Sequence, residues 1–281
     1  MYDAPQTPTG YGYGSLTFGE KISAAIALTK SRGLTIFVTL LVGGFVLFGV
    51  LIIGFLVFGG IPMMLAGGSQ SSGFAAGAIL GFIIVYLAFA LLSQYFMIGV
   101  NSLLLKYVDG QEPDGGVVAQ VLSPWHNFLP VLLCFIVWFV LALVFNIVLA
   151  IFSLIPILGL LINLAGSMIL GMVMSCVLFY IADTGGPSVG DVISTPIRLV
   201  KDNFISWLLA MVTAIVVYLP GGILFGIIAV VARDSAAVWV LGGLIAFVYF
   251  VAASIFAFIF FAITYRQANG GNMGAVVDQV F

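Results

Sequence analysis

The sequence has very few charged residues, and this scarcity decides which class of protein it specifies. Only 6% of its 281 residues are charged and 63% are hydrophobic, whereas soluble globular domains have about 25% charged and about 45–50% apolar residues. The net charge of −2 excludes the basic surface that a nucleic-acid-binding protein needs. The composition therefore predicts a polytopic membrane protein with no nucleic-acid partner.

Histidine and cysteine are also scarce, which excludes most metal, haem and disulfide frameworks. The single histidine, His126, and the two cysteines, Cys134 and Cys176, are too few and too scattered to build one. No nucleophile with a neighbouring base, no phosphate-binding glycine loop and no pair of carboxylates is recognisable in the sequence. We therefore expect no catalytic residue, no metal site and no cofactor, and we expect that the protein is not an enzyme.

Long charge-free stretches mark where the chain crosses the membrane. A transmembrane helix needs about 20 apolar residues. The charge-free stretches at 33–105 and 115–182 are each long enough for two such helices, and those at 203–232 and 235–265 for one each. The sequence thus predicts an all-α polytopic membrane protein with six transmembrane helices, near residues 34–60, 74–100, 128–152, 157–182, 204–231 and 237–265.

Basic residues lie almost entirely on one side of these spans. Seven of the eight lysines and arginines precede the first span, follow the second or the sixth, or lie between the fourth and the fifth, and only Arg233 lies opposite. Lysine and arginine accumulate on the cytoplasmic side of membrane proteins. We therefore predict a multi-pass membrane protein with its N- and C-termini in the cytoplasm.

Cysteine labelling in intact cells tests this orientation. Gln70 lies between the first two spans and Gln111 between the second and the third, so a cysteine at position 70 should react with an impermeant reagent and one at position 111 should not. Labelling at position 111 with protection at position 70 would overturn the orientation.

One segment of the sequence recurs at a fixed distance. Residues 19–30 (GEKISAAIALTK) align without a gap with residues 190–201 (GDVISTPIRLVK), at an offset of 171 residues. Shorter relatives lie at residues 116–122 and 274–281. Apolar residues recur in them at helical spacing, so we expect short amphipathic helices in the inner membrane interface. Ile22 and Ile26 are expected on the apolar face of the first of the two longer helices, and Ile193 and Ile197 on that of the second.

An interfacial helix followed by a helical hairpin is the predicted repeating unit. It occurs over about residues 17–105, 114–183 and 188–266, and because each unit has an even number of spans, the three repeats are expected to be parallel. Residues 1–16 are expected to form a disordered cytoplasmic tail, and residues 272–281 a terminal amphipathic helix. The alternative, that linkers at the inner leaflet are amphipathic without being repeats, stays open.

The longest of these segments also carries a resemblance to known proteins. Residues 190–207 (GDVISTPIRLVKDNFISW) lead into a glycine-containing span. Through this segment and the span after it, the chain resembles a large group of bacterial and archaeal six-helix membrane proteins. The group includes the membrane domain found beside some glycerophosphoryl diester phosphodiesterases. The resemblance covers most of residues 17–281, which we expect to form a single membrane domain. The resemblance implies a fold, an auxiliary role and a location in the prokaryotic inner (plasma) membrane. It implies no catalytic residue, because the sequence has no phosphodiesterase domain.

The deepest polar side chains in the predicted spans belong to Asn146, Asn163 and Ser167. They are candidates for binding a lipid headgroup or a polar solute, and candidates for interhelical hydrogen bonds, which is the interpretation we favour. No aspartate, glutamate, lysine, arginine or histidine falls inside a predicted span, which counts against a proton-driven pump.

Glycines four residues apart mark candidate helix contacts, because they let two helix backbones approach closely. The partner helix can belong to the same chain, to a second copy or to another membrane protein. The candidate positions are Gly73, Gly77 and Gly81 in the second span and Gly222 and Gly226 in the fifth.

These features favour a non-enzymatic integral inner-membrane protein. We expect a scaffold, regulatory or lipid-organising subunit of a larger membrane assembly, whose partners are membrane lipids and either another membrane protein or a second copy of the chain. The alternative is a transporter or channel for a small apolar or amphipathic molecule.

Overall fold

The computed structural model describes residues 16–60, 72–153, 155, 157–231, 235–271 and 273. Every regular element within these ranges is helical, and six helices there are long and apolar enough to cross a membrane. The prediction of an all-α, multi-pass membrane protein is therefore confirmed. Most of the predicted N-terminal tail and most of the predicted terminal amphipathic helix lie outside the described residues.

The long helices form three successive hairpins, and short helices connect them. The first helix, α1, ends in a π-helical turn, η1. The segment between the first and second hairpins consists of the short helix α4 and a 3-10 turn, η2. The bounds are α1 Phe18–Phe55, η1 Leu56–Gly60, α3 Ser72–Val108, α4 Val117–Leu122, η2 Ser123–Asn127, α5 Phe128–Phe152, α6 Leu158–Thr184, α7 Val189–Asp202, α8 Phe204–Val231 and α9 Ala236–Ala268.

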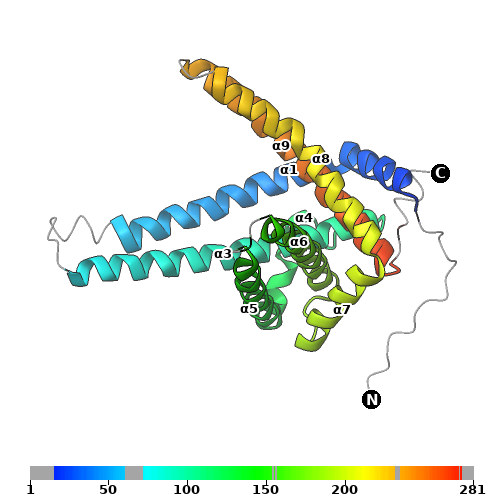
Figure 1. Cartoon of the computed structure of the whole chain (residues 1–281), viewed down its shortest axis with the longest axis horizontal. Helices are drawn as coiled ribbons and strands as arrows, with labels where there is room; N and C mark the ends of the chain where they lie inside the picture. The colour runs from blue at the N-terminus through cyan, green and yellow to red at the C-terminus, as the bar shows by residue number, and fades with distance from the viewer. Residues whose placement is uncertain are drawn as a thin grey trace.

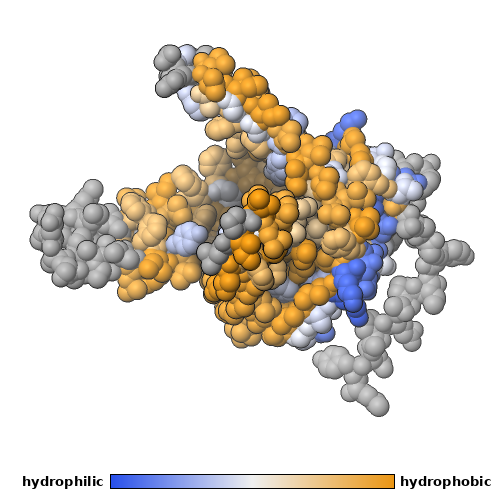
Figure 2. Space-filling view, viewed as in Figure 1, coloured by the Kyte–Doolittle hydropathy of each residue, from blue (hydrophilic) through white to orange (hydrophobic). Residues whose placement is uncertain are grey.

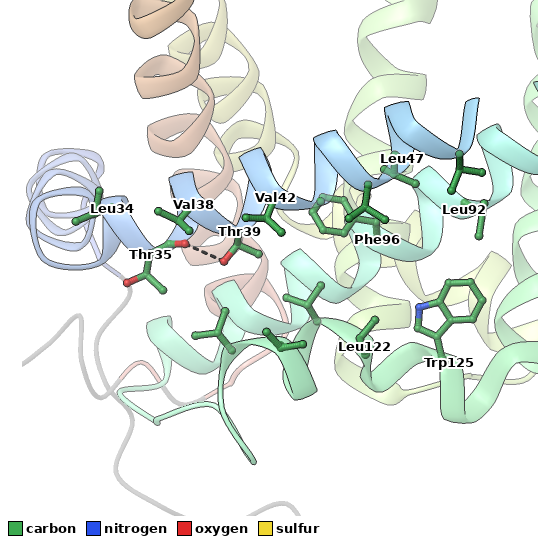
Figure 3. A pocket seen from close by; sticks show the side chains of 16 residues that line it. Leu34, Thr35, Val38, Thr39, Val42, Leu47, Leu92, Phe96, Leu122 and Trp125 are labelled. Atoms are coloured by element: carbon green, nitrogen blue, oxygen red, sulfur yellow. Dashed lines mark hydrogen bonds between the residues drawn. The ribbon is translucent and has the colours of Figure 1, made fainter. Parts of the chain in front are cut away.

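The start of the first hairpin differs from the sequence-based prediction. The segment at residues 19–30 is not a separate interfacial helix but the first part of α1. The helix begins at Phe18, where Thr17 and Glu20 form a reciprocal capping box that satisfies free amides of the first turn. The helix continues because no proline interrupts it near Gly33, although Figure 3 shows that it changes direction near Leu34.

The second helix of each hairpin contributes the core of the molecule. Here α3 contacts both α6 and α9, and α6 and α9 also touch. Tyr95 and Leu103 of α3, Met172 of α6, and Phe260 and Tyr265 of α9 are among the residues that are fully buried there. The core is therefore built around the C-terminal halves of α3, α6 and α9.

Away from this core the hairpins separate. In Figure 1 the α1–α3 hairpin and the α8–α9 hairpin extend in different directions. Only 6% of the most apolar stretch of the first membrane-spanning helix is buried within the chain. Figure 2 shows apolar side chains over the hairpins and hydrophilic ones gathered at the other end of the molecule. The apolar outer parts of the hairpins are therefore free to face lipid or another membrane protein.

Each of the three described segments that we expected to be amphipathic packs beside the second helix of a hairpin. The helix α4 contacts α3, and α7 contacts α6. The first part of α1 lies beside α9, where the rings of Phe18 and Phe260 meet edge to face at 6.0 Å. The N-terminal segment thus takes the place beside the third hairpin that α4 and α7 take beside the first and second.

Candidate functional site

A cluster of charged side chains joins the three hairpins at the hydrophilic end of the core. Arg266, near the end of α9, lies 2.7 Å from a carboxylate oxygen of Asp109 and 2.6 Å from one of Asp183. Asp109 follows α3 and Asp183 lies in the last turn of α6. The side chains of Arg266, Asp109 and Asp183 are 12%, 11% and 21% exposed. We call these three residues the hairpin charge cluster.

Neighbouring polar groups complete the surroundings of this cluster. The hydroxyl of Tyr265 donates a hydrogen bond to Asp183 over 3.0 Å, and the amide of Asn269 donates a second over 3.2 Å. Burial raises the pKa of the Asp109 carboxyl, and the Arg266 guanidinium offsets part of that rise. Removing Arg266 would therefore leave two poorly hydrated carboxylates facing each other.

The arrangement is suited to holding helix ends together. A guanidinium presents its donors in a planar fork, so one arginine can bridge two carboxylates that come from different helices. Within the described residues, no group of histidine, cysteine, aspartate and glutamate side chains could hold a metal ion. The geometry of the hairpin charge cluster therefore supports a structural lock on the hydrophilic end of the bundle.

The predicted glycine contacts differ from one another in the structure. A Cβ atom added to Gly81 would meet the Cβ of Phe58 at 3.0 Å, so Gly81 lies at a close contact inside the first hairpin. Gly73 and Gly77 belong to α3, but their surroundings lie outside the description. Gly222 and Gly226 have open space in front of them: apart from the nearby backbone of α8 itself, no atom of the described chain lies within 4 Å of an added Cβ.

Among the described residues, three of the open grooves lie along the first and third hairpins. The first, of about 690 Å³, lies between α1, α3 and the α4–η2 segment, and Figure 3 shows Val38 and Val42 of α1 across it from Leu122 and Trp125. The second, of about 480 Å³, lies between α1 and α9. The third, of about 700 Å³, runs along α8 and includes Gly222. All three are lined mainly by apolar side chains.

The polar candidates in the spans make hydrogen bonds inside the second hairpin. The amide of Asn163 donates to the Ser153 hydroxyl over 2.7 Å, and the Ser167 hydroxyl donates to Asn163 over 3.4 Å. Because Ser153 follows α5 and Asn163 lies on α6, the first bond joins the two helices, as the favoured interpretation expects. The amide of Asn146 donates instead to the carbonyl of Ala142 on its own helix.

The four isoleucines predicted to form the apolar faces of the interfacial helices lie at the border between core and surface. Ile22 and Ile193 are half-buried and pack against the core, whereas Ile26 and Ile197 are 43% and 45% exposed. The buried face of α7 is shifted by one residue from the predicted one. It consists of Val192, Pro196, Leu199 and Val200.

Two features of the structure were not predicted from the sequence. In the sequence, Asp183 and Arg266 serve only to bound charge-free stretches and, for Arg266, to indicate the orientation, and Asp109 lies in the acidic turn between the second and third spans. Gly99 of α3 was not singled out, although a Cβ atom at this position would clash with the backbone carbonyl of Val121 in α4. A signal for the cluster does exist, because each of its charges lies close to the end of the second helix of a hairpin.

Comparisons with known proteins give no match: no family model, no curated protein and no solved structure matches the chain. The resemblance to the six-helix group therefore stays a prediction.

Proposed function

We propose that the chain is a non-enzymatic integral membrane protein that acts as a scaffold or regulatory subunit of a larger membrane assembly. The proposal places it in the prokaryotic inner (plasma) membrane with both termini in the cytoplasm, where it binds another membrane protein or a second copy of itself and organises the lipid around it. The observation that carries the proposal is the open face of α8 at Gly222 and Gly226.

Glycine on this face favours a helix as the occupant over lipid. A glycine inside a helix costs about 1 kcal/mol relative to alanine, and lipid tails give no return for that cost. Between two membrane helices glycine allows close backbone packing, which is a main source of their association. The adjoining groove also includes Ala214, with Tyr218 and Phe250 among its larger side chains, so its lining is apolar, as a contact with a partner helix requires.

The neighbouring glycine shows what such a contact looks like once it is filled. Gly221, one residue away on α8, lies against the aromatic ring of Tyr249 in α9. This face of α8 therefore holds its own hairpin together, whereas the face at Gly222 and Gly226 has no partner among the described residues. A second helix outside the chain would complete the packing of α8.

The alternative function is a transporter or channel for a small apolar or amphipathic molecule. The hairpin charge cluster closes the core at its hydrophilic end, so a solute path through the centre would require Arg266 to leave both carboxylates. Scaffolding needs no such rearrangement, because its contact surfaces are already on the outside of the hairpins.

The parallel repeat is part of the same proposal, and the burial register supports it. Thr17 and Ser188 occupy equivalent positions, and each accepts a hydrogen bond from the amide three residues later. Leu28 and Leu199 are also equivalent, and both are buried. Two segments 171 residues apart thus present the same faces to the core, which unrelated amphipathic linkers would have no reason to do.

Leucine at both glycines tests the proposed contact. In the Gly222→Leu, Gly226→Leu variant, branched side chains fill the space that a partner backbone would occupy, so a stoichiometric partner should be lost. Because nothing in the described chain lies there, the thermal stability of the purified protein should be unchanged. The measurements are quantitative mass spectrometry of the complex isolated in mild detergent and thermal unfolding of the variant.

Val216→Leu is the matched control, since Val216 is an exposed residue of α8 outside the glycine pair, and it should keep the partner. Equal retention of the partner in the double variant would contradict the proposed contact. A wild-type chain that purifies alone as a monomer and moves a solute across liposomes would favour the transporter instead.

A further inference from the structure

A small cavity at the hydrophilic end of the molecule contains a buried lysine. The cavity has a volume of about 200 Å³ and lies between the first turn of α1, the first turns of α8 and the end of α9. Its polar lining comes from Lys21, Ser206 and Gln267. The remaining lining residues are Leu16, Phe18, Ile205, Leu209 and Phe260.

The ammonium group of Lys21 has no countercharge in the part of the chain that the structure describes. Lys21 is only 5% exposed, and its one hydrogen-bond partner is the neutral hydroxyl of Ser206, at 2.5 Å. The ion pairs found there all belong to other basic residues. A buried ammonium has three donors and a large desolvation cost, so an anion in the cavity would stabilise it.

The internal repeat shows that a lysine is not needed at this position for packing. Lys21 aligns with Val192 of α7, and Val192 is completely buried. A valine therefore satisfies the same packing position in the related segment. The charge at position 21 is an additional property of the first segment, and its surroundings indicate a binding role.

An unsatisfied acceptor lines the same cavity. The side-chain oxygen of Gln267 is buried and has no hydrogen-bond partner, while the amide nitrogen of Gln267 donates to the carbonyl of Leu16 over 3.4 Å. The cavity therefore offers a cationic donor at Lys21 and a neutral acceptor at Gln267. The ligand that fits both is an anion that also carries a hydroxyl group.

The apolar residues around the cavity indicate how such a ligand is attached. Phe18, Ile205 and Leu209 line the cavity and are also exposed on the surface, where acyl chains can pack against them. We infer that the cavity binds the headgroup of an anionic phospholipid with a glycerol headgroup. In this arrangement Lys21 donates to the phosphate and Gln267 accepts a hydrogen bond from a headgroup hydroxyl.

This inference goes beyond the proposed scaffold function and does not depend on it. The cavity lies at the start of α8, whereas the glycine face at Gly222 and Gly226 lies more than three helical turns further along the same helix. Loss of a protein partner and loss of a bound lipid are thus separate outcomes in separate variants.

Native mass spectrometry of the full chain, with defined lipids added in detergent, tests the site. The wild-type protein should retain one phosphatidylglycerol molecule and release phosphatidylcholine under the same activation. Lys21→Met should weaken phosphatidylglycerol retention by about tenfold or more, since it removes a charge-assisted hydrogen bond. Lys30→Met is the matched control, because Lys30 is an exposed lysine of the same helix and should retain the lipid as the wild type does.

Gln267→Leu tests the second half of the site. The wild type should prefer phosphatidylglycerol to phosphatidylmethanol, which has the same charge without headgroup hydroxyls, and Gln267→Leu should remove that preference while still binding both lipids. Lys21→Met should unfold in phosphatidylcholine at the wild-type temperature or above it, because it removes a buried charge. If it does not fold, the Gln267→Leu comparison decides the proposal by itself.

Three results would overturn the inference. The first is equal phosphatidylglycerol retention by Lys21→Met and the wild type, and the second is no preference of the wild type between phosphatidylglycerol and phosphatidylmethanol. The third is an increase in thermal stability with inorganic phosphate as large as that with phosphatidylglycerol, which would assign the cavity to a free anion.

Discussion

Replacing Arg266 with leucine is expected to lower the free energy of unfolding by about 3–5 kcal/mol, the range seen when one partner of a buried ion pair is removed. The variant leaves Asp109 and Asp183 without the guanidinium that bridges them. Both carboxylates would then be poorly hydrated and would repel each other, so the ends of α3 and α6 should separate from α9. Denaturant unfolding of the purified protein in mixed micelles measures the change.

Two further variants show whether the unpaired charge is the cause. Adding Asp109→Asn and Asp183→Asn to Arg266→Leu removes the charges that have lost their partner, and it should restore most of the stability. Arg32→Leu is the control for an exposed pair, because the side chain of Glu112, its partner, is 71% exposed, and it should cost no more than about 1 kcal/mol. Equal stability of Arg266→Leu and the wild type would show that the hairpin charge cluster does not hold the helix ends together.

Most of the helix boundaries were predictable from the sequence because charge, proline and glycine mark them directly. The predicted spans at 128–152 and 204–231 coincide with α5 and α8. Charged residues cannot enter the apolar part of the bilayer cheaply, so the ends of the charge-free stretches restrict where a helix can lie. The boundary near Gly33 was less predictable, because a bend inside a continuous helix needs no breaking residue and is set by packing.

The candidate sites could not be predicted in the same way, because they depend on contacts between distant parts of the chain. Arg266 and Asp109 are separated by 157 positions, and Lys21 and Ser206 by 185. The spacing of residues along one helix predicts which of them share a face. It does not predict which face of another helix packs against that face. The glycine pattern illustrates this: the regular spacing at Gly222 and Gly226 leaves both open, whereas Gly99, outside any such spacing, makes a tight contact.

Replacing Gly99 with leucine is expected to detach α4 from α3 and to cost about 3 kcal/mol or more, at the upper end for an overpacked core position. A Cβ atom at residue 99 would overlap the carbonyl oxygen of Val121. A backbone carbonyl cannot turn away as a flexible side chain can, so α4 must move as a unit. That movement would also break the buried hydrogen bond that Gln120 donates to Ser102 over 2.7 Å.

Hydrogen exchange resolved to peptides separates this effect from general unfolding. In Gly99→Leu the amides of residues 117–122 should lose protection first, while those of α9 stay protected. Gly49→Leu is the matched control, since Gly49 is a glycine of a long helix with nothing within 4 Å of an added Cβ, and it should leave exchange in α4 unchanged. Ser102→Ala removes only the hydrogen bond, so it should cost less than Gly99→Leu. If α4 keeps its protection in Gly99→Leu, the two backbones do not lie in contact, and the packing of α4 against the first hairpin must be different from that described.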